Sequence, residues 1–224
     1  MMKNKLLISV AVMSLYLPLS SSFAAQASQS EMLKDVAVLQ SEWAKIKYQM
    51  SDEKLQLSAI EKLEQQAALT SAKYSDFAEP KIWQGIILST DAGIVKGLSA
   101  LGKVKEAKKL FETSLEQNPT ALNASAHTSL GSLYYQVPGW PIAFGNDEKA
   151  EQHLKAALAV NPDGIDANYF YADFLMESKR YDEARVHFEK ALKAQVRPDR
   201  PIADAGRRHE IETALLKLSA LSKK

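Results

Sequence analysis

The chain has 224 residues, of which 46% are hydrophobic and 25% are charged, and its formal net charge is +1. It contains no cysteine, which excludes a disulfide framework and a lipid anchor attached through cysteine. A charge balance this close to zero argues against nucleic acid or an anionic membrane surface as the partner.

The N-terminus has the layout of a secretory signal peptide over residues 1–27. Two lysines precede an uncharged apolar run, and small residues follow it, with cleavage expected after Ala27 or after Ala24. The alternative is an uncleaved anchor, but the apolar run is interrupted by Ser14, Pro18 and Ser20 and is shorter than the roughly 20 residues that a membrane span needs. We therefore expect a periplasmic protein without stable membrane insertion after cleavage.

Residues 28–79 predict an N-terminal pair of helices. Apolar residues recur at spacings of three and four over residues 31–48, as one buried stripe of a helix requires. Residues 51–54 indicate a break with a helix N-cap, and a second helix is expected over residues 55–73. We interpret this pair as a cap or a degenerate repeat.

Prolines and glycines divide the rest of the chain into further helices. A long helix is expected from Pro80 to Leu101, ended by Gly102, and another follows from Lys103. Proline also ends two helices, after Asn118 and after Asn161. The remaining helices are expected at residues 121–136 and 165–178, and a linker at 197–201 leads into a capping helix within the C-terminal segment 197–224.

Three segments share a small-large-small pattern at a nearly fixed period. Residues 105–119, 148–162 and 182–196 align without gaps, at offsets of 43 and 34 residues. A period near 34 is typical of stacked helical hairpins, in which small side chains let two helices approach closely. The aligned positions hold Ala107, Phe111 and Ser114; Ala150, Leu154 and Ala157; and Ala184, Phe188 and Ala191.

These positions resemble the tetratricopeptide repeat. The unit at residues 165–198 matches with Tyr171, Ala172, Leu175 and the third triplet, but has Asn168 and Val196 at the family's Trp and Pro places. The resemblance implies an all-α fold, a right-handed superhelix of antiparallel hairpins, with three repeats over residues 80–196. It also implies a non-catalytic module that binds a protein or peptide. The exported, interrupted repeats further resemble the helical subunit associated with TRAP-type transporters, which implies docking to a periplasmic transport component.

The first offset, 43 residues, exceeds the second, 34 residues, by nine, and these extra residues lie in a loop at residues 137–146. Prolines and glycines exclude a helix there, yet the loop carries Trp140, Ile142 and Phe144. Exposed, such side chains would form a hot spot for a protein partner. The alternative is that they fold back and seal a gap between hairpins.

The first helix of each hairpin is expected to line the concave face of the superhelix. A solvated helix face without a ligand is the competing interpretation. The candidate binding residues on these helices are Thr128, Ser132, Tyr135, Gln136, Asp166, Tyr169, Asp173, Met176 and Glu177.

Arginines gather near the C-terminus, and four histidines are spread over the second half of the chain. We expect Arg197, Arg200, Arg207 and Arg208 to tie the capping helix to acids such as Asp163 and Asp166, with an anion clamp as the alternative. The histidines, His127, His153, His187 and His209, show no metal-binding spacing.

No sequence motif of a hydrolase, a nucleotide-binding loop or a dinucleotide fold is present, so neither an enzyme nor a cofactor is predicted. Two functions stay open. One is a module that holds a protein partner through its concave face and the loop. The other is a transporter accessory that encloses a small apolar or amphipathic ligand between its helices.

Overall fold

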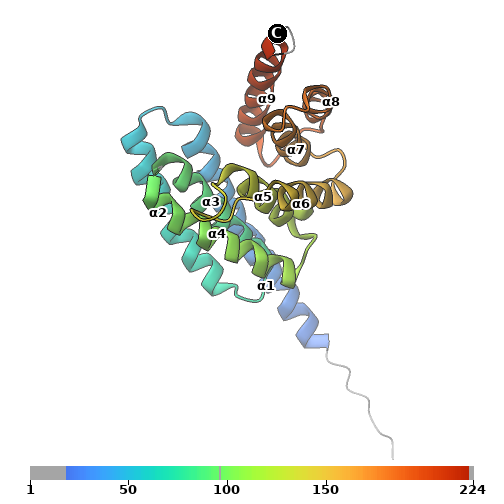
Figure 1. Ribbon diagram of the computed structural model, residues 1–224. Helices are drawn as coiled ribbons and strands as arrows, with labels where there is room; N and C mark the ends of the chain where they lie inside the picture. Colours follow the sequence, from blue (N-terminus) through green and yellow to red (C-terminus); the bar gives the residue numbers. More distant parts are fainter. Residues whose placement is uncertain (1–18, 96, 222–224) are drawn as a thin grey trace, which may run out of the picture.

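The computed structural model describes residues 19–95 and 97–221 and has nine α-helices and no β-strand among them (Figure 1). This confirms the predicted all-α repeat solenoid. Residues 1–18, which hold most of the predicted signal peptide, lie outside the described residues. The helices are α1 (Leu19–Gln49), α2 (Glu53–Lys73), α3 (Ala78–Val95), α4 (Gly97–Gln117), α5 (Ala121–Gln136), α6 (Asp147–Val160), α7 (Ile165–Glu177), α8 (Tyr181–Leu192) and α9 (Pro201–Leu221).

The repeat pattern forms the centre of the core. All nine residues of the three aligned triplets are completely buried. The large members of the first two triplets pack where the preceding helix has a glycine. A methyl group added at Gly131 would lie 2.6 Å from Leu154 Cγ, and one added at Gly85 would lie 2.6 Å from Phe111 Cε1. The small-large-small spacing therefore predicts the contacts between α3 and α4 and between α5 and α6.

The predicted end of the third helix is wrong. It ends at Val95 and not at Leu101, and the next helix begins at Gly97. Gly97 has φ +73°, in the left-handed region that glycine adopts without steric penalty. Gly102 instead lies inside α4, where it is exposed and a side chain would meet no other atom. A glycine on an open helix face weakens the helix without ending it.

The first turn of α5 has a backbone conformation that the sequence does not indicate. Leu122, Asn123 and Ala124 have φ values of 48°, 57° and 60°, in the left-handed region, and the regular right-handed helix follows from there. Leucine and alanine adopt this conformation at a cost of about 1–2 kcal/mol each. Of the three residues only the asparagine is a residue type that favours it.

The first and last helices meet, so the solenoid closes on itself. α9 packs against α1 as well as against α7 and α8. Gly206 makes this possible, because a methyl group there would lie 2.3 Å from the Tyr48 ring. The Tyr48 hydroxyl donates a hydrogen bond of 3.2 Å to Glu210, and Lys47 pairs with the same carboxylate at 3.2 Å.

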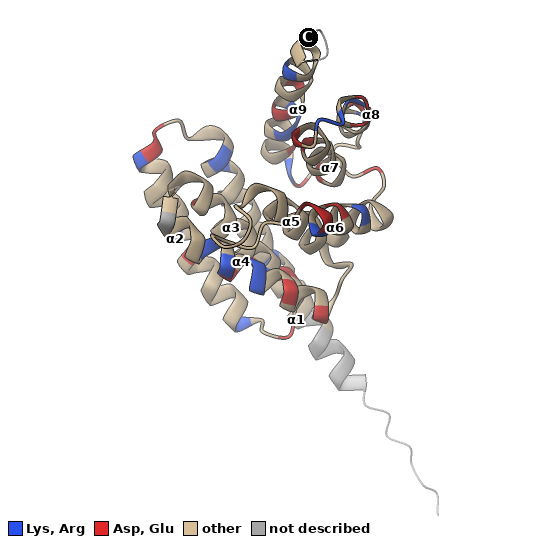
Figure 2. Cartoon of the chain, viewed as in Figure 1, with Lys and Arg blue, Asp and Glu red and all other residues tan. Residues whose placement is uncertain are grey.

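Charges of both signs are distributed over most of the described helices, but the charged residues of α7 are all acidic and α5 carries no Lys, Arg, Asp or Glu (Figure 2). No helix in the described part of the chain is long and apolar enough to cross a membrane. The predicted division into signal peptide, helical pair, repeats and cap stays a prediction.

Candidate functional site

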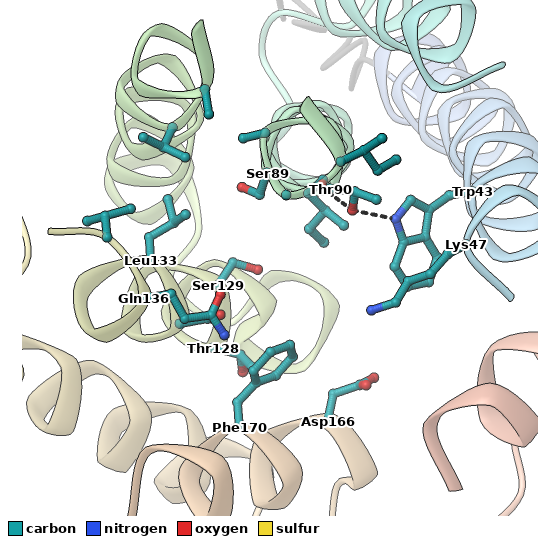
Figure 3. Close-up of a pocket in the computed structure, with 18 of the residues that line it drawn as sticks. Trp43, Lys47, Ser89, Thr90, Thr128, Ser129, Leu133, Gln136, Asp166 and Phe170 are labelled. Carbon is teal, nitrogen blue, oxygen red and sulfur yellow. Dashed lines mark hydrogen bonds between the residues drawn. The ribbon is translucent and has the colours of Figure 1, made fainter. Parts of the chain in front are cut away.

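A partly open cavity of about 860 Å³ lies between the helices. Its wall includes residues from the first helix to the last, and Figure 3 shows side chains from α1, α3, α5 and α7 converging on it. The volume is in the range of small-molecule and cofactor sites. The apolar side chains of the wall are Trp43, Trp83, Ile86, Ile94, Leu101, Val104, Leu133, Val137, Ile142, Tyr169 and Phe170.

Two tryptophans fix one side of the cavity. Trp43 and Trp83 pack edge to face with their ring centroids 5.5 Å apart. The indole Nε1 of Trp43 donates a hydrogen bond of 2.8 Å to Thr90 Oγ1, which in turn donates to the carbonyl of Ile86 at 2.9 Å (Figure 3). Both rings are buried, and the indole N–H of Trp43 is satisfied, so the pair gives the cavity a packed wall.

Small polar side chains alternate with the apolar ones. Serine and threonine hydroxyls line the cavity from α3 and α5, at Ser89, Thr90, Ser125, Thr128, Ser129 and Ser132. A mostly apolar cavity with a few polar groups fits a small amphipathic molecule.

The end of the cavity between α1, α7 and α9 is charged. Asp166 accepts hydrogen bonds from Arg197 Nη1 at 2.8 Å and from Arg207 Nε at 2.9 Å. Burial alone would raise the pKa of Asp166, but Arg207, Arg197 and Arg200 hold it well below its usual range. Burial, together with Arg207, lowers the pKa of Lys47, and burial also lowers that of Arg200.

Six of the twelve predicted binding residues line this cavity. They come from α5, the loop and α7: Thr128, Ser132, Gln136, Ile142, Asp166 and Tyr169. Whether they bind a ligand stays a prediction.

The other predicted residues on α5 and α7 are placed away from it. The Tyr135 hydroxyl donates a hydrogen bond of 2.7 Å to Asp173, which ties α5 to α7. Met176 is buried in the core and Glu177 is exposed on the surface.

The loop at residues 137–146 combines both alternatives. Phe144 folds back onto Tyr134 with ring centroids 5.7 Å apart, while Trp140 is 89% exposed. Backbone hydrogen bonds fix the loop, from Gly145 to the carbonyl of Pro138 at 2.9 Å and from Asn146 to that of Tyr134 at 2.8 Å. The loop therefore packs Phe144 against the hairpin and leaves Trp140 exposed to solvent.

Sequence reasoning missed the cavity residues outside the repeats. Trp43 and Trp83 show up in the sequence only as members of apolar stripes, and Lys47 carries no signal there. The arginines behave partly as expected: Arg197 and Arg207 bind Asp166, but Asp163 pairs with Lys190 at 3.2 Å instead. Arg208 donates to the carbonyls of Leu192 and Ala194.

Two histidines that are distant in the sequence form a pair. His127 Nδ1 and His153 Nδ1 lie 2.9 Å apart, a hydrogen bond that needs at least one neutral ring. No group of three or more metal-ligating side chains occurs within the described ranges. Burial, followed by His127, lowers the pKa of His153 to about 4.

This pair predicts a loss of stability in acid. Between the ordinary histidine pKa of about 6.5 and the folded value, the unfolded chain binds a proton that the folded protein does not, so stability falls as the pH falls. Between pH 7 and pH 4.5, the free energy of unfolding of His153→Gln is expected to decrease by about 2 kcal/mol less than that of the parent, as measured by urea unfolding. His209→Gln, at an exposed position, is the control. Parallel curves for the parent and His153→Gln would contradict the prediction.

Comparison with known families identifies the repeats. Residues 142–204, which include α6, α7 and α8, match the tetratricopeptide repeat family model. The tetratricopeptide repeat predicted from the sequence is confirmed over these residues. The search of curated proteins gave no match. Tetratricopeptide repeat proteins are typically non-catalytic and generally bind protein partners.

Proposed function

We propose that this tetratricopeptide repeat protein is a non-catalytic, exported accessory protein that encloses a small amphipathic ligand in its central cavity. The observation that supports this proposal is the cavity of about 860 Å³, walled from α1 to α9. Open repeat solenoids bind along an exposed concave surface. Here the contact between Tyr48 and Glu210 closes that surface into a ring, which suits a small molecule better than an extended chain.

Native mass spectrometry of the protein purified from its own periplasm tests this function. We expect a co-purifying small molecule at a stoichiometry near one, released on denaturation. The proposal is contradicted if the native mass is that of the polypeptide alone and stays so after incubation with amphipathic compounds. The proposed export rests on residues 1–27 and is tested by N-terminal sequencing, which should find cleavage after Ala27 or after Ala24.

A second candidate function is docking to a protein partner, for which we propose a component of a periplasmic transport system. The loop favours it, because Trp140 is 89% and Ile142 is 60% exposed on a backbone held by hydrogen bonds. A rigid, exposed tryptophan is the residue type most enriched at interface hot spots.

Trp140→Ala is expected to weaken capture of the partner by about tenfold or more without changing the circular dichroism spectrum. Capture is measured by chemical crosslinking in periplasmic extract followed by mass spectrometry. Leu216→Ala is the matched control, since Leu216 is an exposed apolar residue on α9. If both variants capture equally, the loop is not the docking site.

A further inference from the structure

The charged end of the cavity has one cation that the protein itself does not neutralise. Three cationic side chains line the cavity there: Lys47, Arg200 and Arg207. Lys47 pairs with Glu210 at 3.2 Å, and Arg207 pairs with Glu210 at 2.6 Å and with Asp166 at 2.9 Å. Within the described ranges, Arg200 has no ion pair.

Arg200 also has a buried donor without an acceptor. Its Nε is inaccessible to solvent and has no hydrogen-bond partner. Its guanidinium carbon lies 5.1 Å from the centre of the Trp83 ring, which is itself part of the cavity wall. A buried, charged donor left unpaired is costly, and native structures nearly always supply a partner. Because the Nε faces neither solvent nor the cavity, a ligand in the cavity would meet the outer nitrogens of the guanidinium.

The carboxylate that faces the same space is shared among three arginines. Asp166 forms ion pairs with Arg197 and Arg207, and it attracts Arg200 without forming an ion pair with it. An anion entering beside Arg200 and Lys47 would meet a wall whose surplus charge is positive. Burial lowers the pKa of both cations, which is the effect that a nearby anion would offset.

The rest of the cavity is suited to the apolar part of the same molecule. Beyond the charged end, the wall continues with Ile86, Ile94, Leu101, Leu133 and Phe170. The polar side chains that α3 and α5 add to this wall are uncharged. They are serine and threonine hydroxyls, with Gln136 in the last turn of α5. A ligand with charge at both ends would leave its second charge among apolar side chains, which is unfavourable.

We propose that the ligand is an amphipathic monoanion, with a carboxylate or similar group bound between Arg200 and Lys47 and an apolar body along α3, α4 and α5. This inference rests on the proposed function of the cavity and adds the chemical class of the ligand. A guanidinium is well suited to a carboxylate, because its planar donors bind both oxygens.

Tryptophan fluorescence tests the proposal directly. Two of the three tryptophans, Trp43 and Trp83, line the cavity, and Trp140→Phe removes the third from the signal. In this background, decanoate is expected to change the fluorescence and to bind about tenfold or more tightly than decanol, which has the same apolar chain. An apolar hexapeptide with a free C-terminal carboxylate, compared with its C-terminal amide, distinguishes a peptide terminus from a free acid as the source of the anion.

Variants of the arginine assign the effect. Arg200→Met is expected to remove the preference for decanoate over decanol, and Arg200→Lys to keep part of it. Arg185→Met, on α8 and outside the cavity wall, should bind as the parent does. Thermal unfolding shows whether each variant folds.

Two failures have different meanings. If decanol binds as tightly as decanoate, or if Arg200→Met keeps the preference, anion recognition is wrong while the cavity remains a ligand site. If neither compound nor either peptide binds, the proposed function fails together with this inference.

Discussion

Replacing Asp166 with alanine is expected to lower the free energy of unfolding by about 3 kcal/mol. The carboxylate accepts hydrogen bonds from Arg197 at 2.8 Å and from Arg207 at 2.9 Å, and it joins α7 to the linker before α9 and to α9 itself. The side chain of Arg207 is only 5% exposed, so after the loss of Asp166 its buried charge would be left with Glu210 alone, a carboxylate that Lys47 shares. Breaking a buried pair from one side is more damaging than the net value of the pair, because the remaining charge is then only partly compensated.

Asp163→Ala is the matched control for this prediction. Asp163 lies three residues earlier and pairs with Lys190 at 3.2 Å, but its side chain is 84% exposed. Exposed ion pairs contribute about 0–1 kcal/mol, so this variant should unfold almost as the parent does. Urea unfolding at neutral pH measures both. Equal losses in the two variants would mean that burial of the arginine pair does not determine the cost.

The sequence predicts the local packing of the repeats well, because each contact there joins residues of neighbouring helices. Leu154 and Gly131 belong to one hairpin, and their sizes alone indicate that they pack together. The N-cap at Asp52 is equally local, since its carboxylate accepts from the backbone of Lys54 and Leu55. Such features need no knowledge of the remaining chain.

The break between α3 and α4 could not be placed in this way. Gly93, Gly97 and Gly102 are all possible ends of a helix by residue type, and the one that ends it is the one with positive φ. Which glycine takes that conformation depends on how α4 packs back onto α3. Residue type does not show which of the three it is, and the prediction of Gly102 is wrong.

The cavity is harder still to predict, because it depends on contacts between the two ends of the chain. The hydrogen bond from Tyr48 to Glu210 joins residues separated by 162 positions. No periodicity connects them, and Gly206 shows no sign in the sequence of admitting the Tyr48 ring. The repeats predict a curved array, but the closed ring follows from the contacts between α1 and α9.

Gly93→Phe is expected to abolish binding of decanoate in the cavity while leaving the fold intact. Gly93 lines the cavity on α3 and is exposed, so a ring there would occupy the opening. A side chain can be added without collision, since no atom lies within 4 Å of its Cβ position. Phenylalanine also has a higher helix propensity than glycine, so the free energy of unfolding should not decrease.

Gly102→Phe separates the blocked cavity from the general effect of the substitution. Gly102 is exposed on α4, has the same open space around its Cβ position and does not line the cavity. Tryptophan fluorescence in the Trp140→Phe background should therefore show binding of decanoate by Gly102→Phe and none by Gly93→Phe. If Gly93→Phe binds as tightly as Gly102→Phe, the molecule is bound elsewhere on the surface. Because only one of the two glycines lies at the opening, the comparison depends on where the ring is placed and not on its size or hydrophobicity.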